Sequence, residues 1–120
     1  MQNYDMTINK GSTYQLKVNL FGKDINGTTI PYDLTGKDVR SQIRKNYDSC
    51  DYVSFGITID DVVNGQLTLT LGANVSATLK AGSSFWDLEV FDPLDETIVY
   101  RPIGGKVTIS AEVTRWGYYG

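Results

Sequence analysis

Residues 85–91 read Phe85-Trp86-Asp87-Leu88-Glu89-Val90-Phe91 and alternate between two kinds of side chain. The three even-numbered residues are large and apolar, whereas the odd-numbered residues place two acids between two phenylalanines. Because successive side chains of a strand point to opposite faces, this pattern predicts a strand whose even-numbered face is buried. Trp86 is expected near the centre of the core, since an aromatic side chain of its size buries about 150–250 Å².

The same period of two recurs along nearly the whole chain, interrupted by turns that contain glycine or proline. Pro31 has no backbone N–H, so the segment around it is expected at a sheet edge or in a connection. Seven or eight strands with frequent turns describe an all-β sandwich of two sheets. Besides residues 85–91, the expected strands are residues 4–8, 14–20, 39–44, 53–59, 67–71, 98–100 and 107–113.

Three connections have a specific signature. Asn64-Gly65 lies between two expected strands, and this dipeptide favours a type I′ hairpin turn. Residues 73–82 hold the one helical pattern, with Asn74 as the expected N-cap and Gly82 as the C-terminal stop, and we expect this short helix to cross between the sheets. Gly104-Gly105 precedes a strand rather than a helix, which argues against a phosphate loop and predicts a bulge or a sharp entry into the last strand.

One domain is expected over residues 1–120, with a short aromatic tail at residues 116–120, because a chain of this length can bury one core. The inward positions of the expected strands should share that core. They are Leu16, Val18, Phe55, Ile57, Leu69, Trp86, Leu88, Val90, Ile109 and Val113.

The charge balance argues against several classes of partner. With 11 Lys and Arg residues against 14 acids, the net charge is −3, whereas a nucleic-acid binder needs a basic stripe. No secretory signal is visible at the N-terminus, and no apolar run approaches the roughly 20 residues of a membrane span. We therefore expect a soluble protein made in a cytoplasm, with no nucleic-acid or membrane partner. Cys50 is the only cysteine, so no disulfide can form within the chain.

Side chains that commonly perform chemistry are scarce, because the sequence has no histidine. Asp87 and Glu89 lie two apart on one strand face, about 6–7 Å from each other, which is compatible with the paired carboxyl groups of a glycosidase. An outward pair on a sandwich strand is more often solvated or matched to a basic neighbour. We therefore expect no catalytic residue and no cofactor, and we predict that the protein is not an enzyme.

Two acidic segments offer the oxygen ligands that Ca²⁺ prefers. One holds Asp92, Asp95 and Glu96, and the other holds Asp60-Asp61. Turn chemistry explains the first segment without a metal, because Asp followed by Pro is a preferred start of a type I turn. We adopt that interpretation and expect no bound metal.

Aromatic residues outside the expected core are candidates for contacts with other molecules. Tyr47 and Tyr52 flank an acidic segment and would suit stacking on a sugar, although ordinary packing also explains them. Trp116, Tyr118 and Tyr119 form a tail with glycine joints, which has little reason to be ordered alone. We predict that this tail packs into a neighbouring chain, and packing onto its own domain is the alternative.

Several blocks of sequence, taken in order, carry a resemblance that covers nearly the whole chain. They are Gly11-Ser12-Thr13-Tyr14-Gln15-Leu16, Pro31-Tyr32-Asp33-Leu34-Thr35-Gly36 with residues 39–44, Asn64-Gly65-Gln66-Leu67, residues 85–90, and Gly104-Gly105-Lys106-Val107 with Glu112-Val113-Thr114-Arg115. This ordered set resembles the small immunoglobulin-like virion proteins of tailed bacteriophages and is similar to the N-terminal domain of phage baseplate upper proteins. The chain stops at Gly120, whereas the baseplate proteins continue into a helical or fibre region.

The resemblance implies an immunoglobulin-like sandwich that serves as a non-catalytic structural protein of the virion. Such a protein acts as an adaptor or decoration subunit of the tail, baseplate, neck or head, is present in many copies and binds other virion proteins. The expected partner-binding residues are Trp116, Tyr118 and Tyr119 of the tail, with Phe85 and Phe91 on the outward face of their strand. The alternative is a carbohydrate- or receptor-binding module at the virion surface.

Overall fold

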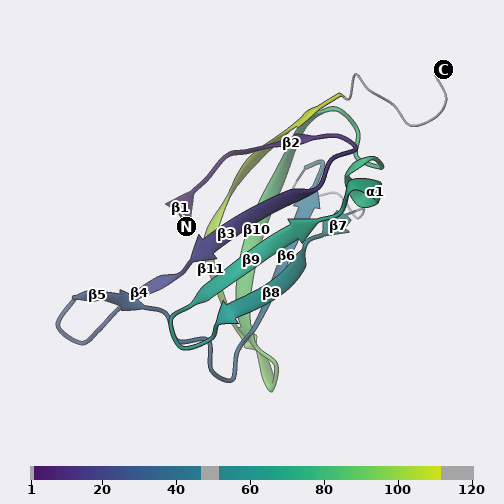
Figure 1. The fold of residues 1–120 in the computed structure, drawn as a ribbon. Coiled ribbons are helices and arrows are strands. Elements are labelled where there is room, and N and C mark those ends of the chain that lie inside the picture. The colour runs from purple at the N-terminus through teal and green to yellow at the C-terminus, as the bar shows by residue number, and fades with distance from the viewer. Residues whose placement is uncertain (1, 47–51, 112–120) are drawn as a thin grey trace.

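The computed structural model describes residues 2–46 and 52–111, which form eleven strands and one short helix (Figure 1). The elements are β1 (Gln2–Asn3), β2 (Met6–Asn9), β3 (Tyr14–Asn19), β4 (Phe21–Lys23), β5 (Thr29–Pro31), β6 (Asp38–Arg44), β7 (Tyr52–Ser54), β8 (Gly56–Asp61), β9 (Gln66–Leu71), α1 (Ala73–Ser76), β10 (Gly82–Asp92) and β11 (Asp95–Ser110).

Two sheets face each other and confirm the predicted sandwich. The large sheet has the order β1-β11-β10-β6-β7, with β2 also paired to β11, and the small sheet has the order β3-β9-β8. The runs β7-β6-β10-β11 and β8-β9-β3 follow the arrangement of strands C′-C-F-G and D-E-B in an immunoglobulin domain. As in that fold, neighbours in space are mostly antiparallel, and β1 and β2 pair in parallel with β11.

The core lies between the two sheets and is filled from the alternate positions of their strands. Trp86, Leu88 and Val90 of β10 are all at most 3% exposed, which confirms the pattern read from residues 85–91. Of the expected core residues, Val18, Phe55, Leu69 and Ile109 are also buried, and Leu16 and Ile57 are partly buried against the same cluster. Val113 lies outside the described residues. Further buried apolar residues are Met6, Ile8, Leu20, Leu34, Val39, Ile43, Leu67, Leu71, Leu79 and Val107.

The last two expected strands are one continuous strand, β11, and Gly104-Gly105 lies inside it in regular register. The prediction of a bulge or strand entry at these glycines was therefore wrong. The β10–β11 pair has register shifts between Leu88 and Val90 and between Phe91 and Asp92. At the first of these β11 inserts Arg101-Pro102, and proline is tolerated there because a bulge frees its position from the ladder. Gly105 is required for a different reason: a Cβ atom on it would lie 2.4 Å from the carbonyl oxygen of Tyr4.

The two other predicted connections differ in detail from expectation. β8 and β9 form the predicted hairpin, but the loop covers residues 62–65 and only Gly65 has a positive φ, at 66°. A type I′ turn needs positive φ at both central residues, so that turn type was wrong. The helix is shorter than predicted and Gly72, not Asn74, is its N-cap, but α1 does lead from the small sheet to the large one.

A two-stranded ribbon of β4 and β5 extends away from both sheets (Figure 1). Its turn is held by Asp24, whose Oδ1 accepts the backbone N–H groups of Asn26 and Thr28, both at 2.9 Å. The prediction that the segment around Pro31 is an edge or a connection is confirmed, because β5 pairs only with β4 among the described strands. We call residues 21–31 the arm.

Candidate binding face on the large sheet

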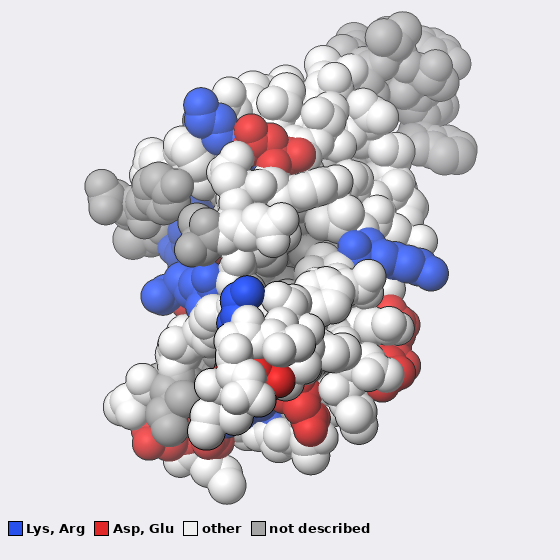
Figure 2. Space-filling model, turned by 90° about the vertical axis from the view of Figure 1, so that its left-hand side faces the viewer, with Lys and Arg blue, Asp and Glu red and all other residues white. Residues whose placement is uncertain are grey.

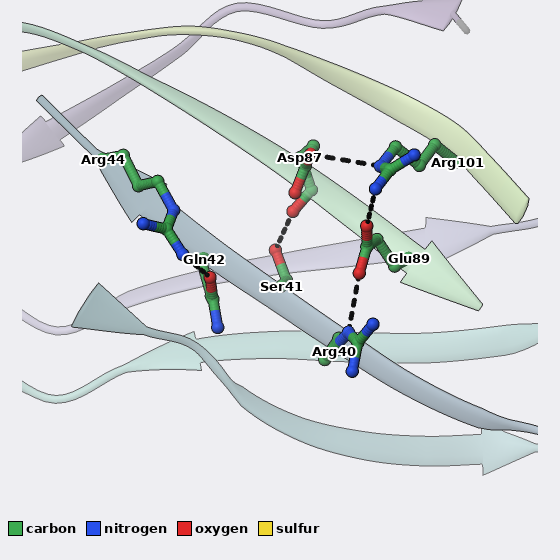
Figure 3. Close-up of a pocket in the computed structure, with 7 residues that line it drawn as sticks. All are labelled: Arg40, Ser41, Gln42, Arg44, Asp87, Glu89 and Arg101. Carbon is green, nitrogen blue, oxygen red and sulfur yellow. Dashed lines mark hydrogen bonds and ion pairs between the residues drawn. The ribbon is translucent and has the colours of Figure 1, made fainter. Parts of the chain in front are cut away.

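The outer face of the large sheet carries a polar hollow built by β6, β10 and β11 (Figure 3). The antiparallel register places Arg40 opposite Glu89 and Gln42 opposite Asp87, so side chains from two strands project on one face. The hollow has a volume of about 420 Å³. Its lining residues are Arg40, Ser41, Gln42, Arg44, Asp87, Glu89 and Arg101.

Glu89 is the centre of an ion-pair network in this hollow. Its Oε1 accepts from Arg40 Nε at 2.6 Å, and its Oε2 lies 2.5 Å from Arg101 Nη2. Burial alone would raise the pKa of Glu89, but the hydrogen bonds and charges of Arg40 and Arg101 outweigh burial and lower it. Both carboxylate oxygens are therefore committed to guanidinium groups.

Arg101 reaches this network because of the bulge in β11. Arg101 and Pro102 together lie opposite Glu89, between the pairs Leu88–Ile103 and Val90–Tyr100. The extra residue bends the strand and redirects its side chains, which is a common role of bulges near sites. Arg101 thereby lies beside Glu89 on the outer face (Figure 3).

Asp87 has a different environment although it lies only two residues from Glu89. Its Oδ2 is 3.8 Å from Arg101 Nε, so this ion pair is loose. Burial raises the pKa of Asp87, the charge of Glu89 raises it further, and the more distant arginines oppose both effects only in part. On β11 the residue opposite Asp87 is Gly104, which has no side chain to meet the carboxylate.

The pKa values of Asp87 and Glu89 shift in opposite directions, so replacing each residue by its amide should change the stability of the fold differently. Glu89→Gln removes a carboxylate that the fold stabilises, so it should lower the free energy of unfolding by about 1–2 kcal/mol at pH 7. The pKa of Glu89 is lower in the folded protein than in the unfolded chain, where it is about 4.3. The difference in unfolding free energy between parent and variant should therefore be largest above pH 4.3 and should shrink as the pH falls through the folded-state pKa. Urea unfolding at pH 7, 5 and 3.5 measures the difference.

Asp87→Asn is the matched control for that experiment. The raised pKa of Asp87 means that its ionised form is disfavoured in the folded protein, so the amide should be as stable as the parent at pH 7 or more stable. A loss of stability in Asp87→Asn equal to that in Glu89→Gln would contradict the assignment of the network to Glu89.

Two arginines of this face lie on aromatic rings. The Cζ atom of Arg40 is 4.4 Å from the ring centroid of Phe91, and that of Arg44 is 4.8 Å from the ring centroid of Tyr52. Phe85 faces outward as predicted and lines a smaller hollow that adjoins the first through Gln42, Arg44 and Asp87. Phe85 and Phe91 are both half-buried and lie at opposite ends of the acid pair, so they form no joint apolar patch.

Several of the other residues predicted to bind partners, sugars or metal ions lie away from this hollow. Trp116, Tyr118, Tyr119 and Tyr47 lie outside the described residues. The acidic loops use their carboxylates locally, as turn chemistry predicts: Asp92 Oδ1 accepts from Leu94 N–H, and Asp95 Oδ1 accepts from Thr97 N–H and its hydroxyl. Asp60 Oδ2 accepts from the hydroxyl of Thr68 on the neighbouring strand. Within residues 2–46 and 52–111, no group of three acids or cysteines is placed to hold a metal ion.

Sequence reasoning missed the basic half of the hollow. The period of two in residues 39–44 places Arg40 and Arg44 on the outward face. Their position opposite the acids of β10 depends on strand register, and the position of Arg101 depends on a bulge. The available signal was the alternation of residues 39–44, whose outward positions hold two arginines and so match an outward acid pair.

The charges elsewhere are interspersed. On the side of the molecule drawn in Figure 2, basic and acidic residues are interspersed, and neither sign forms one continuous region. None of the described helices is long and apolar enough to span a membrane.

Comparison with protein-family models and with curated proteins found no match for this chain. Among solved structures, the chain is similar to one described as "The details of glycolipid glycan hydrolysis by the structural analysis of a family 123 glycoside hydrolase from Clostridium perfringens". The two share 12% sequence identity with a TM-score of 0.43, and the match covers 94% of this chain and 24% of that chain. The chain thus spans about a quarter of that enzyme's solved chain, and a likeness this distant assigns no function.

Proposed function

We propose that this chain is a non-catalytic structural protein of a tailed-bacteriophage virion, an adaptor or decoration subunit that binds other virion proteins. The observation that carries the proposal is the arm, whose apolar side chains are turned to solvent. Phe21 is 54% exposed, Ile30 is 41% exposed and Ile25, at the turn, is fully exposed. Large apolar side chains on a projecting ribbon gain free energy when a partner removes them from water.

The acid pair supports a non-catalytic role. Two neighbouring carboxyl groups with opposite pKa shifts are typical of an acid and a base in hydrolases. A retaining glycosidase needs one carboxylate as nucleophile, but both oxygens of Glu89 are bound by arginines. Glu89 is better explained as the connector between β6, β10 and β11, because it binds Arg40 of β6 and Arg101 of β11.

The virion assignment is tested on particles. Mass spectrometry of purified tailed-phage particles encoded by the same genome should detect this chain beside the known structural proteins. Its absence from particles in which the other structural proteins are all detected would contradict the proposal.

The arm is tested with substitutions that leave folding intact. Phe21→Ser combined with Ile25→Ser should melt like the parent, because these side chains are exposed, and should reduce incorporation into particles. Val63→Ser is the matched control, since Val63 is 57% exposed but lies on the β8–β9 loop of the sandwich. Equal incorporation of all three proteins would show that the arm is not the docking element.

The aromatic tail belongs to the same proposal. We expect Trp116, Tyr118 and Tyr119 to contribute to assembly, so deletion of residues 116–120 should weaken assembly far more than folding. A truncated protein that melts like the parent and is incorporated at full occupancy would remove the tail from the partner-binding residues.

A further inference from the structure

The hollow on the outer face of the large sheet is lined by polar groups of both kinds. Its volume of about 420 Å³ lies within the range of ligand pockets, about 300–1,000 Å³, but pockets for apolar ligands have mainly hydrophobic walls. Here every lining residue is charged or polar. A ligand that fits must therefore exchange hydrogen bonds rather than bury apolar surface.

The charges of the hollow favour a neutral ligand. Three guanidinium groups line it, so a cation would meet repulsion from Arg40, Arg44 and Arg101. An anion would lie beside two carboxylates, and two of the arginines already neutralise Glu89. Three guanidinium groups and two carboxylates leave a formal excess of only one positive charge, and a ligand with no net charge avoids repulsion from groups of either sign.

Acceptors and donors remain available at the middle of the hollow. Within residues 2–46 and 52–111, no side chain donates a hydrogen bond to the Asp87 carboxylate, whose side chain is 43% exposed. Gln42, directly opposite, accepts from Arg44 Nη2 at 3.0 Å through its Oε1, which leaves its amide N–H groups as donors. Figure 3 shows the Asp87 carboxylate between the guanidinium groups of Arg44 and Arg101.

We propose that this hollow binds a neutral sugar ring. The Asp87 carboxylate accepts hydrogen bonds from neighbouring hydroxyls, while the Gln42 amide and the Arg101 guanidinium donate to hydroxyl oxygens. Hydroxyl groups suit this lining because each one both donates and accepts. Phe85 lines the small hollow that adjoins this site beside Gln42 and Asp87. The site rests on the geometry of the sheet and does not depend on the virion assignment.

The probes are glucose, galactose, mannose and N-acetylglucosamine, each titrated into the full chain labelled with ¹⁵N. We expect at least one sugar to bind saturably with a Kd of about 1–10 mM, as for a small polar ligand on an open site. The shifts should be confined to amides of β6, β10 and β11 and to the Gln42 side chain. Absence of saturation for all four sugars up to about 50 mM would overturn the proposal.

Two variants make the test specific to the hollow. Asp87→Asn should weaken binding about tenfold or more, because hydrogen bonds to a charged group are the strong ones. Asp60→Asn removes the same charge from β8 in the other sheet and should leave the Kd unchanged. Equal affinity in Asp87→Asn and the parent would overturn the site.

Charged probes distinguish a sugar from a partner protein's side chain. Acetate and methylguanidinium imitate acidic and basic side chains, and each should bind more weakly than the best sugar. Stronger binding of either ion at the same amides would overturn the sugar proposal in favour of a protein contact. Hydrolysis of a 4-nitrophenyl glycoside that is lost in Asp87→Asn would support the sugar site and overturn the non-catalytic role proposed above.

Discussion

Replacing Trp86 with alanine is expected to lower the free energy of unfolding by about 3–5 kcal/mol, a large share of the stability of a domain this size. Trp86 is 3% exposed, and its ring makes edge contacts with Tyr4 and Phe55, both with centroids 6.4 Å away. The substitution leaves a cavity between the sheets and removes the hydrogen bond from Trp86 Nε1–H to the Tyr4 carbonyl, at 2.8 Å. Urea unfolding of the variant and the parent measures the loss.

Trp86→Phe separates the two contributions. Phenylalanine keeps most of the apolar volume but cannot donate to the Tyr4 carbonyl, so a smaller loss of about 1–2 kcal/mol is expected. An alanine variant with an unchanged midpoint of unfolding would show that Trp86 is not at the centre of the core.

Gly105→Ala is expected to cost about 2–3 kcal/mol or more although it adds a single methyl group. The new Cβ would lie 2.4 Å from the Tyr4 carbonyl oxygen and 2.8 Å from Asp5 Oδ1. The Tyr4 contact involves backbone, which cannot move aside as a side chain can, so the segment between β1 and β2 must shift away from β11. That movement also breaks the hydrogen bond from Lys106 N–H to Asp5 Oδ1, at 3.0 Å. Hydrogen exchange should therefore increase selectively in β1 and β2.

Gly56→Ala is the matched control, because Gly56 also lies in a strand and a Cβ there meets its nearest neighbour, the Thr70 carbonyl oxygen, at an ordinary 3.5 Å. Its stability should stay within about 0.5 kcal/mol of the parent. Similar losses in both variants would mean that any strand glycine is costly to replace, and that the approach of Tyr4 is not the cause.

The sandwich could be predicted because the alternation of apolar and polar residues within each strand indicates which face of that strand is buried. Alternation in residues 85–91 fixes which side chains of β10 are buried, and the structure confirms it. The arrangement at Gly104-Gly105 could not be predicted in this way, since a glycine required by a distant backbone has the same local signature as one required by a bulge. The shape of the 62–65 loop likewise depends on the register shift between β8 and β9.

The sequence predicted the acidic residues of the candidate site but not the arginines that bind them. The outward direction of Asp87 and Glu89 follows from the period of two, and a basic neighbour was expected for such a pair. Which carboxylate is bound by arginines follows from strand register and from the bulge that inserts Arg101-Pro102. Both are properties of pairing between segments far apart in the sequence, and single-strand patterns do not contain them.

The parallel pairing of β2 with β11 has a kinetic consequence. Met6 lies beside Val107, and Lys106 donates to Asp5 across a sequence separation of 101 residues. Closing so long a loop costs conformational entropy before the contacts between β2 and β11 can stabilise the protein. Topologies rich in β-strands with such sequence separations fold in roughly milliseconds to seconds rather than microseconds. During synthesis β2 is made long before β11, so the β2 residues Met6 and Ile8 lack this pairing until β11 has also been made.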